Sequence, residues 1–225
     1  MGIEAGKIRA ILFDIDGTLS DSDDLLIKKI ERLIKPLSIF ISSEKRHTLS
    51  RFLVMTAESP GNFIYNLADR FDLDSFFISM LNAGTLKKKH RIKTYWMVPG
   101  SKDLIEQLSG RYPMGIVSAR DKTSTMAFLN QFKITKYFGA IVTSQTCRYT
   151  KPFPDPMFHA AKEVGIDPQN CLMVGDTTVD MKAAKLAGMQ AVGVLCGFGH
   201  EKELRRAGAD LILPSTADLL QVFKP

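Results

Sequence analysis

Long apolar runs, paired cysteines and internal repeats are all missing from this sequence, and each absence excludes a class of protein. No stretch approaches the roughly 18 consecutive apolar residues that a membrane-spanning helix needs, so we expect no membrane partner. The first apolar run, residues 8–15, is interrupted by Arg9 and Asp14 and has no small-residue cleavage site after it, so we expect no signal peptide. The three cysteines are odd in number and widely spaced, which predicts free thiols in a cytoplasmic protein rather than disulfides or a zinc site.

The charge is basic overall and unevenly placed. The formal net charge is +6 and the sequence pI is about 9.2, so a polyanionic partner has to be considered. Residues 19–95 hold 13 basic and 9 acidic residues, which leaves 17 and 15 for the rest of the chain. The densest basic run is Lys87-Lys88-Lys89-His90-Arg91-Ile92-Lys93, which is either a solvated face or a surface that attracts anionic substrates. Because no DNA- or RNA-binding motif accompanies it, we do not expect a nucleic-acid partner.

From about Trp96 to the C-terminus, short β-rich runs alternate with helical stretches. The predicted strands are 115–117, 140–142, 171–174, 191–195 and 211–213, together with the N-terminal run 8–15. The predicted helices begin near Asp121, span 155–164 with Gly165 as the stop, and span 181–187 with Gly188 as the stop. Such alternation predicts an α/β fold, with a Rossmann-like parallel sheet that carries helices on both faces.

Residues 20–95 show almost no strand signal. Apolar residues recur at helical spacing over 26–37, 49–53 and 64–71, and 76–81 is a plausible fourth helix. The sequence therefore predicts an α/β core from 1–18 and 96–225, with an inserted all-helical cap over 19–95.

The sharpest chemical feature is Asp14-Ile15-Asp16-Gly17-Thr18, at the end of the first apolar run. Two carboxylates two positions apart at the end of a buried strand repel each other unless a cation compensates them. Carboxylate oxygens suit Mg²⁺, which favours one or two carboxylates together with substrate phosphate. The alternative is a strand followed by an acidic turn, with Asp and Gly serving as turn formers.

Three further sites strengthen the metal interpretation. Ser118 follows a predicted strand, Lys151 opens the rigid segment 151–156, and Asp176 follows the strand 171–174 in the loop that ends at Asp180. Read alone, each has an ordinary explanation as a cap, a surface lysine or a polar loop. Together they matter more, because Asp14, Ser118 and Asp176 each follow a separate strand, where open α/β sheets bind their ligands.

This constellation resembles the haloacid dehalogenase superfamily, and the resemblance covers nearly the whole chain. The four motifs of that family are matched in order and spacing by Asp14 to Thr18, by Ser118, by Lys151-Pro152 and by Gly175-Asp176 through Asp180. The stretches 180–189 and 207–210 are similar to the phosphoglycolate phosphatase and pyrophosphatase branch, in which a helical cap follows the first motif.

The resemblance implies a Mg²⁺-dependent phosphatase that acts on a small phosphorylated metabolite. Asp14 is then the nucleophile that forms an aspartyl-phosphate, and Asp16 is the acid that protonates the leaving group and later the base that activates water. The expected substrate-binding residues are Ser118, Ala119 and Lys151. The expected metal ligands are Asp14, the backbone carbonyl of Asp16, Asp176 and, through water, Asp180.

Several alternatives stay open at this point. Dehalogenases of the superfamily need no metal and lack the second aspartate, so Asp16 and Asp176 argue against them. A sugar phosphomutase of the β-phosphoglucomutase type has the same core motifs, and only the cap decides whether water or a sugar hydroxyl accepts the phosphoryl group. A signalling receiver domain is about half this length and has no helical insert. An anion- or nucleic-acid-binding protein is the other non-enzymatic option. We expect a monomer or a homodimer.

Overall fold

A single parallel sheet organises the part of the chain that the computed structural model describes, residues 2–21 and 94–223. Six strands of these residues pair in the order β3-β2-β1-β4-β5-β6, which is the order of a doubly wound α/β sheet. All five pairings are parallel, as predicted. The strands are β1 (Ala10–Phe13), β2 (Met114–Val117), β3 (Ala140–Val142), β4 (Cys171–Gly175), β5 (Gln190–Val194) and β6 (Leu211–Leu213).

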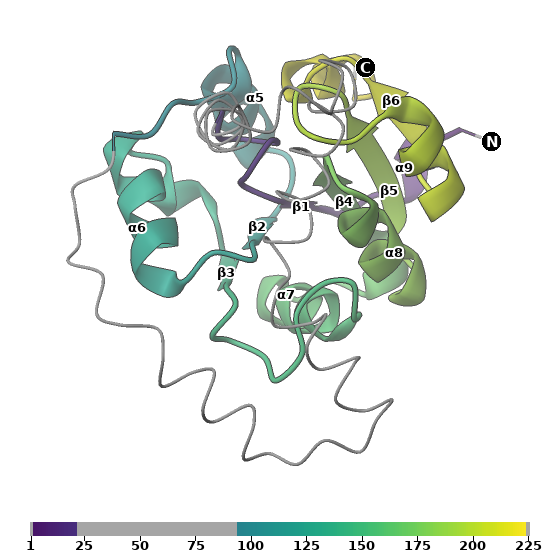
Figure 1. Cartoon of the computed structure of the whole chain (residues 1–225), viewed down its shortest axis with the longest axis horizontal. Coiled ribbons are helices and arrows are strands. Elements are labelled where there is room, and N and C mark those ends of the chain that lie inside the picture. Colours follow the sequence, from purple (N-terminus) through teal and green to yellow (C-terminus); the bar gives the residue numbers. More distant parts are fainter. Residues whose placement is uncertain (1, 22–93, 224–225) are drawn as a thin grey trace, which may run out of the picture.

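Helices cover both faces of the sheet (Figure 1). One face carries α5 (Ser101–Ser109), α6 (Lys122–Gln131) and the 3-10 helix η5 (Thr216–Gln221), which pack large aliphatic and aromatic residues against the strands. The other carries α7 (Asp155–Val164), α8 (Thr178–Leu186) and α9 (Glu201–Ala207), whose core is richer in alanine and methionine. The predicted Rossmann-like core is confirmed.

The two central strands are the most deeply buried. Every residue of β1 and β4 is buried, because helices cover these strands on both faces. Ile11 and Phe13 point to one core cluster and Ala10 and Leu12 to the other, as the period of two in a strand requires. Burying a large apolar side chain contributes roughly 1.5–3 kcal/mol. The packed core therefore holds the ends of β1 and β4 in fixed positions.

The helix boundaries follow local capping signals. Helix α7 spans Asp155–Val164 as predicted, and Gly165 ends it in the left-handed conformation with a φ of 73°. Helix α8 begins at Thr178, three residues before the predicted start, because Thr177 and Asp180 form a capping box around its first turn.

The chain leaves and re-enters the core at one place. The Asp21 backbone N–H donates to the carbonyl of Trp96 at 2.9 Å, and the Val98 N–H donates to that of Leu19 at 2.9 Å. Most of the predicted helical cap and the whole basic run at 87–93 lie outside the described residues, so the domain division stays a prediction. Within the described ranges, no helix has both the length and the apolar character needed to cross a bilayer.

Candidate active site

The site lies at the carboxyl edge of the sheet, where adjacent strands end together. Because β1 pairs with β2 on one side and with β4 on the other, Asp14, Ser118 and Asp176 follow three neighbouring strands. The Asp14 N–H still donates to the Val174 carbonyl at 3.0 Å, so Asp14 is fixed by the sheet itself. This is the edge at which open α/β sheets bind ligands.

Lys151 joins two of the acidic residues. Its Nζ lies 2.8 Å from Asp14 Oδ1 and 2.5 Å from Asp180 Oδ1, and all three side chains are at most 8% exposed. The other oxygen of Asp180 accepts from the Thr177 N–H at 3.0 Å and from its hydroxyl at 2.6 Å. The lysine is thus aimed at Asp14 by a carboxylate that is itself held at the start of α8.

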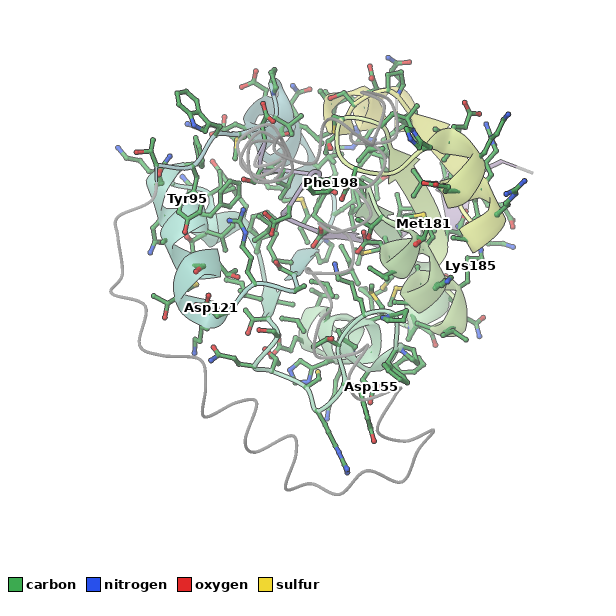
Figure 2. The ribbon with its side chains drawn as sticks, in the orientation of Figure 1. Tyr95, Asp121, Asp155, Met181, Lys185 and Phe198 are labelled. Atoms are coloured by element: carbon green, nitrogen blue, oxygen red, sulfur yellow. The ribbon has the colours of Figure 1, made fainter. Side chains whose placement is uncertain are left out.

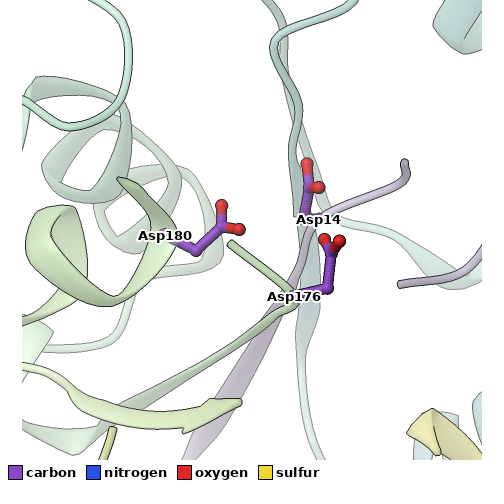
Figure 3. Close-up of side chains that lie close together, drawn as sticks. All are labelled: Asp14, Asp176 and Asp180. Carbon is purple, nitrogen blue, oxygen red and sulfur yellow. The ribbon is translucent and has the colours of Figure 1, made fainter. Parts of the chain in front are cut away.

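Three buried carboxylates surround one small space. Oxygens of Asp14, Asp176 and Asp180 all lie within 4.8 Å of one another, and Figure 3 shows the three side chains facing the same space from different segments. Among the described residues, Lys151 forms the ion pairs of this group, so one ammonium faces three carboxylates. Buried carboxylates in such excess repel one another unless a cation joins them. The donor set is hard oxygen, which fits a divalent cation of the Mg²⁺ or Ca²⁺ kind.

Asp176 is positioned by two glycines and two donors. A Cβ on Gly17, whose φ is 72°, would lie 2.2 Å from Asp176 Oδ2, and one on Gly197 would lie 2.1 Å from it. The carboxylate accepts from the Phe198 N–H at 2.8 Å and from the Thr18 hydroxyl at 3.2 Å. Gly17 belongs to the first motif, whereas residues 197–198 lie in no sequence motif, so only the structure shows their contact with Asp176.

Burial changes the acidity of the site. It raises the pKa of Asp14 to about 7, against the opposing charge of Lys151 and with smaller raising effects from Asp180 and Asp16. Burial alone would lower the pKa of Lys151, but the charges of Asp14 and Asp180 outweigh it and leave that pKa raised above its ordinary value. Lys151 therefore stays a cation, while Asp14 titrates near neutral pH when no metal ion is bound.

Asp16 lies apart from the three clustered carboxylates and pairs with a residue that the sequence analysis missed. Arg120 donates from Nε to Asp16 Oδ2 at 2.7 Å and from Nη2 to Oδ1 at 2.5 Å. Burial by itself would lower the pKa of Arg120, but Asp16 raises it. The sequence signal that could have pointed to Arg120 is its place two positions after Ser118, in the loop that follows β2.

The second motif residues lie where the sequence placed them. Ser118 is buried, and its N–H donates to the Val142 carbonyl at 2.9 Å, so it extends the pairing of β2 with β3. Its hydroxyl accepts from the Arg120 N–H at 3.1 Å. Ala119 is exposed between these two residues. The contacts of Ser118 and Ala119 with substrate stay predictions.

Comparison with known proteins agrees with this geometry. A family model described as haloacid dehalogenase-like hydrolase matches residues 11–194. A phosphoglycolate phosphatase from Nitrosococcus oceani is 29% identical, with 93% of each chain covered. Pyrophosphatase PpaX from Oceanobacillus iheyensis is 26% identical, with 96% of this chain and 97% of that protein covered. The crystal structure of a hydrolase from Pseudomonas syringae superimposes with a TM-score of 0.70 at 25% identity, over 95% of this chain and 96% of that one.

The doubly wound sheet, the buried acidic edge and these matches define an α/β hydrolytic enzyme. The chain belongs to the haloacid dehalogenase-like hydrolase family, because the family model covers most of its length, including β2, β4 and all of β1 but its first residue.

Proposed function

We propose that this protein is a Mg²⁺-dependent phosphatase that hydrolyses a small phosphorylated metabolite through an aspartyl-phosphate on Asp14. One observation carries the proposal: Asp14 directly follows β1, one of the two central strands, and lies 2.8 Å from the Lys151 ammonium beside two further buried carboxylates. A buried carboxylate flanked by a cation and a candidate metal site is suited to attack phosphorus, because both positive charges offset its repulsion from phosphate.

The residues divide the reaction into two steps. In the first, an Asp14 oxygen attacks phosphorus, the bond to the leaving oxygen breaks, and Asp16 supplies the proton that this oxygen needs. In the second, Asp16 removes a proton from water, whose oxygen attacks the phosphorus of the aspartyl-phosphate and regenerates the Asp14 carboxylate. Lys151 stabilises charge on the transferring group, and Ser118 donates a hydrogen bond to a phosphoryl oxygen.

Four groups would hold Mg²⁺. They are the carboxylates of Asp14 and Asp176, the backbone carbonyl of Asp16 and, through water, the carboxylate of Asp180, and the close approach of the three carboxylates supports this assignment. When bound, the ion would supply charge compensation between the nucleophile and the phosphate.

The relatives suggest where to look for the substrate. Because one is named a phosphoglycolate phosphatase and another a pyrophosphatase, 2-phosphoglycolate and pyrophosphate are the first compounds to test.

The three cysteines have no disulfide partner, which supports a reducing, cytoplasmic location.

The test is a phosphate-release assay with p-nitrophenyl phosphate and a panel of phosphorylated metabolites. We expect turnover to require added Mg²⁺ and to stop in excess EDTA. Undiminished turnover with chelator would contradict the metal assignment. Isomerised sugar phosphate without net phosphate release would instead indicate a phosphomutase.

A further inference from the structure

Arg120 binds the carboxylate proposed as acid and base, and it does so with the fixed geometry of a two-point contact. Its Nε and Nη2 meet the two oxygens of Asp16 at 2.7 and 2.5 Å, and the side chains are 12% and 21% exposed. A guanidinium that binds both oxygens of a carboxylate fixes the plane of that carboxylate as well as its distance. A lysine at this place could not make the same two-point contact.

Three neighbouring groups hold Arg120 in turn. Its Nη2 also donates to the Ser20 hydroxyl at 3.2 Å. The guanidinium carbon lies 5.0 Å from the centre of the Tyr95 ring and 5.4 Å from that of Phe128 in α6. Stacking on aromatic rings of this kind stabilises a guanidinium and favours arginine over lysine.

Tyr95 is itself fixed to α6. Its N–H donates to Gln131 Oε1 at 3.1 Å, and Gln131 Nε2 donates back to the Tyr95 carbonyl at 2.8 Å. Its ring meets that of Phe128 edge-on with 5.8 Å between centres, and Figure 2 shows Tyr95 beside this helix. The aromatic support of Arg120 is therefore rigid.

The pairing commits two of the three guanidinium nitrogens of Arg120 to neighbouring side chains. The hydrogen bonds of Nε and Nη2 go to Asp16 and Ser20, and Nη1 is buried without a hydrogen-bond partner in the described part of the chain.

We propose that Arg120 is a positioning residue that acts through Asp16, an inference that rests on the proposed function. It holds the Asp16 carboxylate at one place and in one plane beside Asp14, where water must be activated after the aspartyl-phosphate has formed. The same bonds have to loosen for Asp16 to reach a leaving oxygen. Arg120 thus serves the second step of the reaction more than the first.

The experiment follows the two steps separately in a single turnover with 2,4-dinitrophenyl phosphate, whose leaving group needs no proton from Asp16. For Arg120→Met, we expect the aspartyl-phosphate to form at a rate within about twofold of wild type and to hydrolyse about tenfold more slowly. Arg120→Lys keeps the charge but not the two-point contact, so its rate of aspartyl-phosphate hydrolysis should lie between those of wild type and Arg120→Met.

Arg111→Met is the matched control. Arg111 also lies over an aromatic ring, 5.6 Å from the centre of Tyr112, and donates to the Phe223 carbonyl at 2.7 Å, but it precedes β2 at the other edge of the sheet. We expect it to leave both rates unchanged, so an equal slowing by both variants would overturn the proposal.

A double-mutant cycle with Asp16→Asn separates positioning from packing. If Arg120 acts through Asp16, Arg120→Met should change the hydrolysis rate by less than about twofold in the Asp16→Asn background. Two results would overturn the inference but not the proposed phosphatase function. One is that Arg120→Met slows hydrolysis as much in the Asp16→Asn background as in wild type. The other is that Arg120→Met slows formation and hydrolysis of the aspartyl-phosphate equally. Wild-type protein that never forms an aspartyl-phosphate would overturn the proposed function first, and this inference with it.

Discussion

Two ion-pair groups lie at the same edge of the sheet and differ in their charge balance. Among the described residues, the group around Lys151 is unbalanced, because one cation faces three buried carboxylates, whereas Arg120 and Asp16 pair one to one and both are more exposed. The unbalanced group is unfavourable without a further cation and is therefore suited to bind one. The pair of Arg120 and Asp16 is suited to hold one carboxylate in place. The carboxylates around Lys151 are thus suited to bind a cation, whereas Arg120 is suited to position a carboxylate.

Asp14→Asn should have the largest effect, because it removes the proposed nucleophile from the unbalanced group. We expect kcat/KM to fall at least about a thousandfold, or about 4 kcal/mol of transition-state stabilisation. Steady-state kinetics with Mg²⁺ measures this fall, and far-ultraviolet circular dichroism should show an unchanged fold. An active Asp14→Asn protein would exclude Asp14 as the attacking group.

Lys151→Met tests the buried cation. Its removal should lower kcat/KM by about a hundredfold and, because it leaves buried carboxylates unpaired, destabilise the metal-free protein by about 3 kcal/mol at neutral pH. Urea denaturation measures the stability.

Lys185→Met is the control for Lys151→Met, since Lys185 pairs with Asp210 at 2.9 Å but is 40% exposed. Exposed pairs contribute little, so we expect a loss below about 1 kcal/mol and unchanged kinetics. Equal losses for the two lysines would contradict the distinction between buried and exposed pairs.

The pH dependence of stability tests the raised pKa of Asp14. A folded-state pKa of about 7 against 3.8 in the unfolded chain means that the folded protein holds the proton more tightly. This contribution to stability is present at low pH and is lost as pH rises from about 4 to about 7.

In EDTA, wild type should therefore lose about 2 to 3 kcal/mol more than Asp14→Asn between about pH 5 and pH 8. Denaturant unfolding of both proteins at each pH gives the difference, in which other titrating groups cancel. A difference that does not change with pH would show that burial does not raise the pKa of Asp14.

The smallest effect is expected at the basic run outside the described residues. Changing Lys87, Lys88 and Lys89 together to glutamine should alter kcat/KM by less than about threefold, because we interpret the run as a solvated face. Kinetics at low and moderate ionic strength provides the check. A fall of about tenfold at low salt that shrinks as salt rises would make the run part of the substrate entrance.

Local signals predicted much of the core. The strand 140–142 and the helix 155–164 have the predicted bounds because β-branched residues, proline and a terminal glycine mark them. Helices α5 and α9 were not singled out. Gly100 precedes α5 without a capping side chain and His200 caps α9, so neither has a usual start signal.

The sequence predicted the position of site residues that directly follow a strand. It did not predict side-chain contacts between segments far apart in the sequence. Asp14, Ser118 and Asp176 follow strands, so a parallel sheet places all three at the same edge. The pair of Arg120 with Asp16 spans 104 residues of sequence and depends on which strand lies beside β1. Sequence periodicity predicts that a strand exists but not its neighbour, so this pairing required the structure.

The central claim is that Asp14 becomes phosphorylated, and trapping the intermediate tests it most directly. Asp16→Ala should slow hydrolysis of the aspartyl-phosphate, so acid-quenched protein incubated with 2,4-dinitrophenyl phosphate and Mg²⁺ should carry one phosphoryl group. Peptide mass spectrometry should place that group on Asp14, and Asp14→Asn treated in the same way should carry none. Unmodified Asp16→Ala protein that still turns over, or a phosphoryl group on another residue, would contradict the account.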